Sequence, residues 1–346
     1  MNQTLKGDIV REFARNNPDL PDLTLARLIH ANNKELFANA EAVRTLVRYH
    51  RGSKENWTRK GKGNFHRDPV KSTRTKGSNV AWEYRAPRSH VEPREDFIIN
   101  GSQRILRFAD IHYPFHSERA LDAAINFGIK MDPTILLLDG DIIDQHDQSK
   151  FEKDPSKRYE QAELEMICGE LDAFRKAFPK ARIIWKEGNH EDRFRRYLMR
   201  SAPSIAKYQN KEGKALFDIP SLLTMYGGPS TMMGVEWIHE KRTLRAGDIA
   251  FWHGHERKFG GKYIAARLLD IAKENIMCSH FHRRDEARAR ALNGKVIRSW
   301  CTGALCDLSP DYLPYNDWNH GFAFIEVDKD GEFEARNLAI DNGKVR

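Results

Sequence analysis

The strongest constraint on the fold is an alternation of apolar segments and helical patterns that begins near residue 98. Three buried strands with polar ends are predicted, at 104–112, 134–144 and 181–192. Each is followed by an amphipathic helical pattern, at 119–131, 160–178 and 193–202. Further strands are predicted at 248–256, 274–282, 295–305 and 321–328, with a helix at 261–273. Because strands that alternate with helices form parallel sheets, residues 98–346 are expected to fold as one α/β domain.

Two segments with a different character precede this domain. Residues 1–52 show three short helical patterns, which need one another for stability and suit a helix-turn-helix module. In the third pattern Arg44, Arg48 and Arg51 are spaced to share one face, where they would contact nucleic acid. A small packing or assembly bundle is the alternative. Residues 53–97 are polar and basic without a sustained period, which is typical of a linker.

The positive charge of the chain is confined to its N-terminal quarter. The formal net charge is +8; residues 1–95 hold 19 Lys and Arg against 11 Asp and Glu, and the remainder holds 38 of each. Such asymmetry favours a polyanionic partner, for which nucleic acid is the first candidate. A solvated basic tether explains the same composition.

Other features of composition exclude several classes of protein. The chain has no run of 18 apolar residues and no apolar core of a signal peptide near residue 1, so no membrane partner is expected. Its four cysteines lack the spacing of a disulfide scaffold or a thiolate metal site. We therefore expect a reduced, cytoplasmic protein, in the host cytoplasm if a phage encodes it.

Five predicted strands end in the same kind of polar residue. These ends are Asp110 and His112; Asp141 and Asp144; Asn189 and His190; His253 and His255; and His280 and His282. In an open α/β sheet the ligand site lies beyond the carboxyl ends of the strands, so the five groups are expected to converge. Their oxygen and nitrogen donors suit Mn²⁺ first, with Fe, Zn²⁺ or Ni²⁺ as alternatives. The ligands are too many for one ion, which indicates two ions sharing a carboxylate.

The order of these blocks resembles the calcineurin-like metallophosphoesterase superfamily. The blocks are D-x-H, G-D-x-x-D, G-N-H-E, H and a final H-x-H, and the resemblance covers about residues 103–325. It implies a four-layer α/β/β/α sandwich. The helical segment in front resembles phage-type members that carry a helix-turn-helix-like segment.

The resemblance also implies a role for each matching residue. Asp110, His112 and His282 would hold one metal, and Asn189, His253 and His280 the other, with Asp141 bridging both. A water between the metals would then attack phosphorus in line. His190 would protonate the leaving oxygen or stabilise the transition state, and Asp144 would orient it. His255 and Arg193 are candidate substrate contacts.

The sequence departs from the family pattern at two places. Ser279 stands where the last block usually begins with Gly, and its small side chain still permits metal binding. Gln145 and His146 replace the Arg-Gly of the protein Ser/Thr phosphatases, which argues against a phosphoprotein substrate.

Taken together, the residues predict a dinuclear phosphodiesterase that acts on nucleic acid as a nuclease. A small-molecule phosphoesterase, acting on cyclic nucleotides or dinucleoside polyphosphates, or a phosphatase is the first alternative. A DNA-binding regulator with an inactive phosphoesterase domain is the second. Residues 201–247 are open to interpretation as a lid or as a connecting loop.

Overall fold

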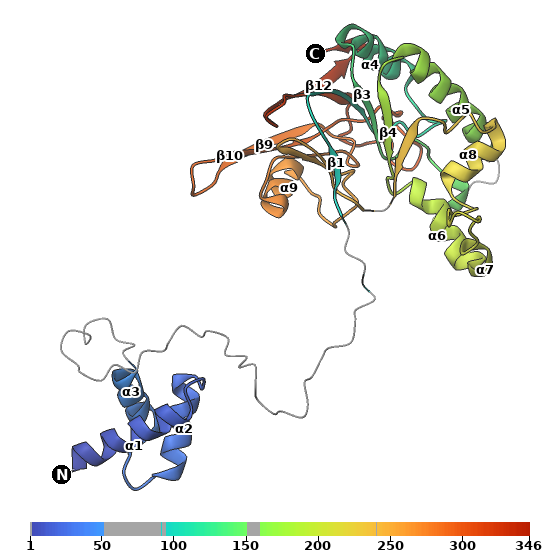
Figure 1. The fold of residues 1–346 in the computed structure, drawn as a ribbon. Helices are drawn as coiled ribbons and strands as arrows, with labels where there is room; N and C mark the ends of the chain where they lie inside the picture. Colours follow the sequence, from blue (N-terminus) through green and yellow to red (C-terminus); the bar gives the residue numbers. More distant parts are fainter. Residues whose placement is uncertain (1, 52–90, 92–94, 151–159, 240) are drawn as a thin grey trace. The chain divides into compact units, whose positions relative to one another are not determined.

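The chain forms two compact units, Met1–His90 and Val91–Arg346. A computed structural model describes residues 2–51, 91, 95–150, 160–239 and 241–346 (Figure 1). The basic linker predicted at 53–97 therefore lies almost wholly outside the described residues. The second unit already includes residue 97, because a strand that starts there pairs within its sheet.

The N-terminal unit contains the three predicted helices. They are α1 (Asn2–Asn16), α2 (Asp22–Asn32) and α3 (Ala40–His50). Their apolar faces share one small core, to which Val10, Leu25, Ile29, Val43 and Val47 contribute. The side chain of Asn39 caps α3 by accepting a hydrogen bond from the Ala42 amide at 2.9 Å. Each helix is short, so the shared core supplies the stability that an isolated helix would lack.

The prediction that Arg51 faces nucleic acid is wrong. Arg51 still has a right-handed helical backbone at the end of α3, and it shares the face of the buried Val43 and Val47, so its side chain points into the unit and is only 8% exposed. Its guanidinium donates to the main-chain oxygens of Leu20 at 2.7 Å and Asn17 at 2.9 Å, and to Asp22 at 2.9 Å. Arg44 and Arg48 are half-buried on α3, and Arg44 forms an ion pair with Glu41 at 3.2 Å.

The C-terminal unit is built on two mixed sheets. The larger has the order β13-β12-β11-β2-β3-β4-β5. Its parallel strands are β2 (Gln103–Phe108), β3 (Ile135–Asp139), β4 (Arg182–Lys186) and β5 (Val235–Ile238). Its antiparallel part is β11 (Gly321–Val327), β12 (Phe333–Asp341) and β13 (Lys344–Val345).

The smaller sheet has the order β1-β6-β7-β8-β10-β9. Its strands are β1 (Phe97–Ile99), β6 (Leu244–Ala246), β7 (Ile249–Phe251), β8 (Ile276–Cys278), β9 (Asp285–Arg290) and β10 (Val296–Cys301). Strands β7, β8 and β10 run parallel, so the chain leaves β7 and β8 at the same edge of this sheet.

The two sheets face each other, and helices cover their outer faces (Figure 1). On β3, Ile135 and Leu137 point into the core between the sheets, whereas Leu136 and Leu138 point to the helices. Strands buried on both faces need such continuous apolar sequence. The larger sheet is covered by α4 (Glu118–Met131), α5 (Glu160–Ala177) and α8 (Ile219–Gly227), and the smaller by α9 (Ile264–Ala272). This arrangement confirms the predicted four-layer α/β/β/α sandwich.

Part of residues 201–247 belongs to the sandwich, through α8, β5 and β6, whereas most of residues 203–216 are exposed. Helix α6 (Glu191–Ser201) and the short α7 (Pro203–Ala206) lead into α8, which packs on α5. Strand β5 pairs with β4, and β6 lies between β1 and β7. The remaining element is a 3-10 turn at His146–Gln148.

Among the described residues, no helix combines the length and apolarity that crossing a membrane requires. All four cysteines are unpaired there, with Cys278, Cys301 and Cys306 buried.

We expect Arg51→Ala to destabilise the N-terminal unit by about 2–3 kcal/mol, because three acceptors lose a charged donor. Hydrogen exchange of the α1 and α3 amides in the full chain measures this. Arg44→Ala is the matched control and should change stability by less than about 1 kcal/mol, since its ion pair is exposed to solvent. If Arg51→Ala left exchange unchanged yet weakened binding to DNA, the inward role would be refuted.

Candidate metal centre

The seven predicted ligands come together at one edge of the sandwich. Asp110 and His112 follow β2, Asp141 follows β3 and Asn189 follows β4. From the smaller sheet, His253 follows β7, and His280 and His282 follow β8. Parallel strands deliver their carboxyl ends to a common edge, which is why residues distant in sequence meet here.

Asp141 lies at the middle of the cluster. Its Oδ1 accepts a hydrogen bond from the His190 amide at 2.9 Å, and this fixes the carboxylate. Its Oδ2 lies 3.1 Å from His253 Nε2 and 4.0 Å from His280 Nδ1. Burial would raise the pKa of Asp141, but His190 and His253 outweigh this and hold it well below its usual range. Asp141 is therefore a carboxylate at neutral pH.

Asp110 repeats this arrangement on the other side. Its Oδ2 accepts from the His280 amide at 3.0 Å, which leaves Oδ1 directed at the neighbouring rings. Oδ1 lies 3.5 Å from His282 Nε2 and 4.0 Å from His253 Nε2. The Nε2 atoms of His112 and His282 are 3.1 Å apart. In both carboxylates, one oxygen is anchored by an amide and the other faces imidazoles.

The donor atoms fit a pair of cations. Several buried side-chain atoms of the described residues lack a hydrogen bond of acceptable geometry, and four of them belong to predicted ligands: Asp110 Oδ1, Asn189 Oδ1, His253 Nε2 and His280 Nδ1. Leaving buried polar atoms unpaired is costly, whereas a shared cation would satisfy them together. Two three-residue groups that could each hold an ion, Asp110/His112/Asp141 and Asp141/His253/His280, share Asp141.

Hydrogen bonds to backbone or carboxylate oxygens select the ligand nitrogen of two histidines. His253 Nδ1 donates to the main-chain oxygen of Asp139 at 2.9 Å, so the ring presents Nε2 to the site. His112 Nδ1 lies 3.0 Å from Asp144 Oδ1, which likewise directs its Nε2 to the site, beside the Nε2 of His282. Cys306 Sγ is 3.7 Å from His282 Nδ1, but burial raises the pKa of this thiol to about 12. Cys306 Sγ thus lies beside the Nδ1 of the His282 ring, whereas the Nε2 of that ring faces Asp110.

The backbone at these positions adopts a conformation that non-glycine residues avoid. Five ligands have a positive φ: Asp110 (52°), His112 (54°), Asp141 (53°), His280 (72°) and His282 (55°). Such strain persists only where the surroundings enforce it, and it clusters at functional sites. Glycines permit the close packing: a Cβ at Gly140 would lie 2.5 Å from His253 Nδ1, and one at Gly188 would collide with Asp141.

Glu191 joins the loops that follow β3 and β4. Its carboxylate accepts from the amides of Asp141 at 2.9 Å, Ile142 at 2.8 Å and Gly188 at 2.8 Å. Glu191 therefore holds the bridging residue and the loop of Asn189 in register. The sequence alone left open whether it supports the site or only favours the start of α6.

Asp144, His190 and Arg193 form a connected group beside the ligands. His190 Nδ1 lies 2.8 Å from the main-chain oxygen of Asp144 and 3.1 Å from its Oδ1. Arg193 donates to the same main-chain oxygen at 2.8 Å, and its Nη2 lies 2.8 Å from His190 Nε2. Burial lowers the pKa of His190, although Asp141 raises it. The neutral ring therefore carries its proton on Nδ1 and accepts from Arg193.

His255 lies behind the ligands. Its side chain is almost fully buried, and its ring centroid is 5.4 Å from that of His253. Burial, aided by the charge of His253, lowers its pKa to about 3, so the ring stays neutral. A contact between His255 and substrate remains a prediction.

Two buried ion pairs beneath the site are not among the sequence predictions. Arg107 donates to Asp139 at 2.7 Å and to Ser279 Oγ at 3.1 Å. Ser279 Oγ in turn donates to the main-chain oxygen of His253 at 3.0 Å. Lys186 pairs with Glu256, whose carboxylate accepts from the His253 amide at 2.9 Å. The basic residues inside the apolar strands RILRF and RIIWK were the available signal.

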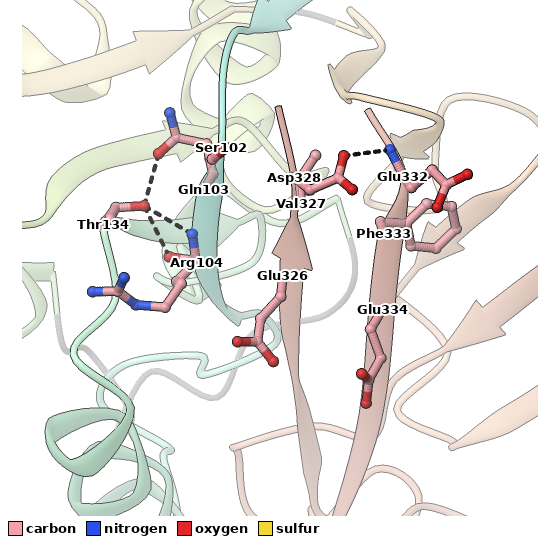
Figure 2. A pocket seen from close by; sticks show the side chains of 10 residues that line it. All are labelled: Ser102, Gln103, Arg104, Thr134, Glu326, Val327, Asp328, Glu332, Phe333 and Glu334. Carbon is pink, nitrogen blue, oxygen red and sulfur yellow. Dashed lines mark hydrogen bonds between the residues drawn. The ribbon is translucent and has the colours of Figure 1, made fainter. Parts of the chain in front are cut away.

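A hollow of about 510 Å³ lies at the end of the larger sheet opposite the metal centre, where β2 begins and β11 ends (Figure 2). It is lined by four carboxylates, those of Glu326, Asp328, Glu332 and Glu334, and by no histidine among the described residues. This hollow lacks the mixed donor set of the metal centre.

Comparisons with known proteins agree with the ligand pattern. A family model described as calcineurin-like phosphoesterase matches residues 103–284, a stretch that contains all seven predicted ligands. Gene 54 protein of Mycobacterium phage D29 is 26% identical over 243 residues, which are 66% of this chain and 90% of that protein. Gene 54 protein of Mycobacterium phage L5 is 25% identical over 247 residues, with the same shares covered.

Solved structures also match the chain, among them the following two. Yfce, a phosphoesterase from E. coli, has 11% identity and a TM-score of 0.30 over 69% of this chain and all of that one. Vacuolar Protein Sorting 29 from Cryptosporidium parvum has 12% identity and a TM-score of 0.37, covering 71% of this chain and 96% of that one.

We expect Asp141→Asn to weaken binding of both ions and to lower turnover by at least about 10²-fold, because the shared carboxylate loses its charge. Metal analysis after dialysis and the hydrolysis rate of a chromogenic diester measure the two effects. Asp270→Asn, an exposed carboxylate on α9, is the control and should change neither. Full metal content and full rate in Asp141→Asn would contradict the shared-ligand assignment.

Proposed function

Because the chain belongs to the calcineurin-like phosphoesterase family, we propose that it is a phosphodiesterase that cleaves nucleic acid. Metal-dependent hydrolysis of phosphoesters follows from the family itself, whose members depend on two metal ions. The choice of nucleic acid as the substrate is the proposal.

The ligand residues divide into two sets that share one member. The residues that would hold one cation are Asp110, His112 and His282, and those for the other are Asn189, His253 and His280, with Asp141 common to both. Two divalent cations, when bound, supply an acidified water and positive charge beside the phosphoryl oxygens. Asn189 adds a neutral oxygen donor, which leaves more positive charge for an anionic substrate.

The reaction adds water across one P–O bond. A hydroxyl group joins phosphorus, and the leaving oxygen departs as an alcohol with the second proton. The Arg193 guanidinium is held by His190 Nε2 and the Asp144 carbonyl. Its positive charge would stabilise the negative charge that develops on the departing oxygen. His190 orients this guanidinium by accepting from Arg193 through Nε2.

The observation that carries the choice of substrate is the charge distribution. The excess of positive charge lies within residues 1–95, whereas the residues that follow are neutral as a whole. A basic N-terminal part would bind a polyanion by counterion release and hold the catalytic unit on it. Within that part, Arg44 and Arg48 remain candidate contacts with nucleic acid, whereas Arg51 is no longer a candidate.

His190→Ala is expected to retain both metals and to lose about 10²–10⁴ in rate, the usual scale for a group acting on the leaving oxygen. Metal analysis and the kcat for a chromogenic diester test this. Loss of a metal in this variant would make His190 a ligand, and an unchanged rate would remove it from the reaction.

The nucleic-acid proposal is tested by comparing the full chain with residues 91–346, each supplied with Mn²⁺. Both forms should hydrolyse a chromogenic diester equally well. On labelled single- and double-stranded DNA, the shorter form should lose at least about tenfold in kcat/KM. Its dependence on salt should also become weaker, because fewer phosphates are neutralised.

A different outcome would favour the small-molecule alternative. If neither DNA nor RNA is cleaved while a cyclic nucleotide, a dinucleoside polyphosphate or a monoester turns over well, the nucleic-acid proposal fails.

A further inference from the structure

A cavity of about 200 Å³ opens directly beside the metal centre. His112, His282 and Asp144 form its inner side. Phe115, Pro310, Tyr312 and Trp318 supply the apolar walls, and Asp307 and Asp311 supply carboxylates. We call it the aromatic pocket.

The outer wall of this pocket is a fixed loop, residues 307–319. The side-chain amide of Asn316 donates to the main-chain oxygens of Leu308 at 2.7 Å and Leu313 at 2.8 Å, which closes the loop on itself. The main-chain amide of Asn319 donates to the main-chain oxygen of His282 at 2.9 Å. The loop is thereby tied to a metal ligand, so its side chains keep a set position relative to a bound phosphate.

Aromatic rings line the pocket from this loop. The Trp318 ring stands edge-on to the His282 ring, with centroids 4.1 Å apart, and Tyr312 lies 6.4 Å from Trp318. Tyr312 is 77% exposed and stands at the rim. Rings placed beside a reactive centre bind planar heterocycles by stacking.

The described residues that line the pocket include three aspartates and three histidines, and none of them is Lys or Arg. A neutral group with N–H donors suits these carboxylates. Nucleobases with an exocyclic amine have this character, and carboxylates accept from such amines.

We propose that the aromatic pocket binds an unpaired nucleobase of the nucleotide whose phosphate is cleaved, with preference for bases that carry an exocyclic amine. This inference rests on the proposed function and specifies its substrate. The pocket has room for one heterocycle and not for a base pair, so the enzyme acts on single strands or frayed ends.

The test uses p-nitrophenyl esters that differ only in the second group on phosphorus. The esters of guanosine and thymidine 5′-monophosphate are compared with methyl p-nitrophenyl phosphate, which has no base. We expect the guanosine ester to exceed the methyl ester by at least about tenfold in kcat/KM, mainly through KM, and to exceed the thymidine ester.

Variants of the pocket should reduce this preference. Tyr312→Ala and Trp318→Ala are each expected to lower the ratio of guanosine ester to methyl ester by about tenfold, and Trp318→Phe should restore most of it. Asp311→Asn should reduce the preference for guanosine over thymidine. Tyr208→Ala, an exposed tyrosine outside the pocket, is the matched control and should not change the ratio.

Trp318 contacts a metal ligand, so the metal content of its variants is measured as well. If Trp318→Ala loses metal, Tyr312→Ala still decides the question, because the ring contact of Tyr312 within the described part of the chain is to Trp318 and not to a metal ligand.

The outcomes separate the pocket from the proposed function. Equal rates on guanosine and methyl esters, or an unchanged ratio in Tyr312→Ala, would overturn the pocket assignment even if DNA is cleaved. A pocket-dependent preference without cleavage of DNA or RNA would support the pocket as a nucleotide site and overturn only the nucleic-acid substrate.

Discussion

The structure of the site depends on the placement of one carboxylate, that of Asp141. Its backbone has φ 53°, a conformation that costs energy for a residue with a side chain. Three contacts enforce it: Glu191 accepts from its amide, its Oδ1 accepts from the His190 amide, and Gly188 leaves room beside it. The remaining oxygen then faces His253 and His280, where a shared cation would satisfy all of them.

The sandwich supplies the rigidity that this placement requires. Strands β2, β3 and β4 are buried on both faces, so the points at which they end are fixed by two apolar layers. Two buried ion pairs also support His253. The pair Arg107–Asp139 is linked to it through Ser279 and through the main-chain oxygen of Asp139, which lies against the His253 ring. In the pair Lys186–Glu256, the Glu256 carboxylate accepts from the His253 amide. Breaking a buried pair leaves a charge without a partner, so these pairs also fix the relative position of the sheets.

The sequence predicted the features that rest on local patterns. Apolar strands with polar ends indicated the α/β unit and the residues that meet at its edge, since strand ends share an edge whatever their separation in sequence. The grouping of Arg51 with Arg44 and Arg48 was wrong, although helical spacing also places Arg51 on the face of the buried Val43 and Val47. The sequence did not predict strands β5 and β6, because they are short and only partly apolar. It did not predict the aromatic pocket either, because only the fold brings together the loops that form its walls.

Anomalous diffraction from crystals soaked in Mn²⁺ tests the central claim most directly. The account predicts two peaks, one bounded by Asp110, His112 and His282, the other by Asn189, His253 and His280, with Asp141 touching both. A single peak, or peaks that leave Asp141 without a metal contact, would contradict it.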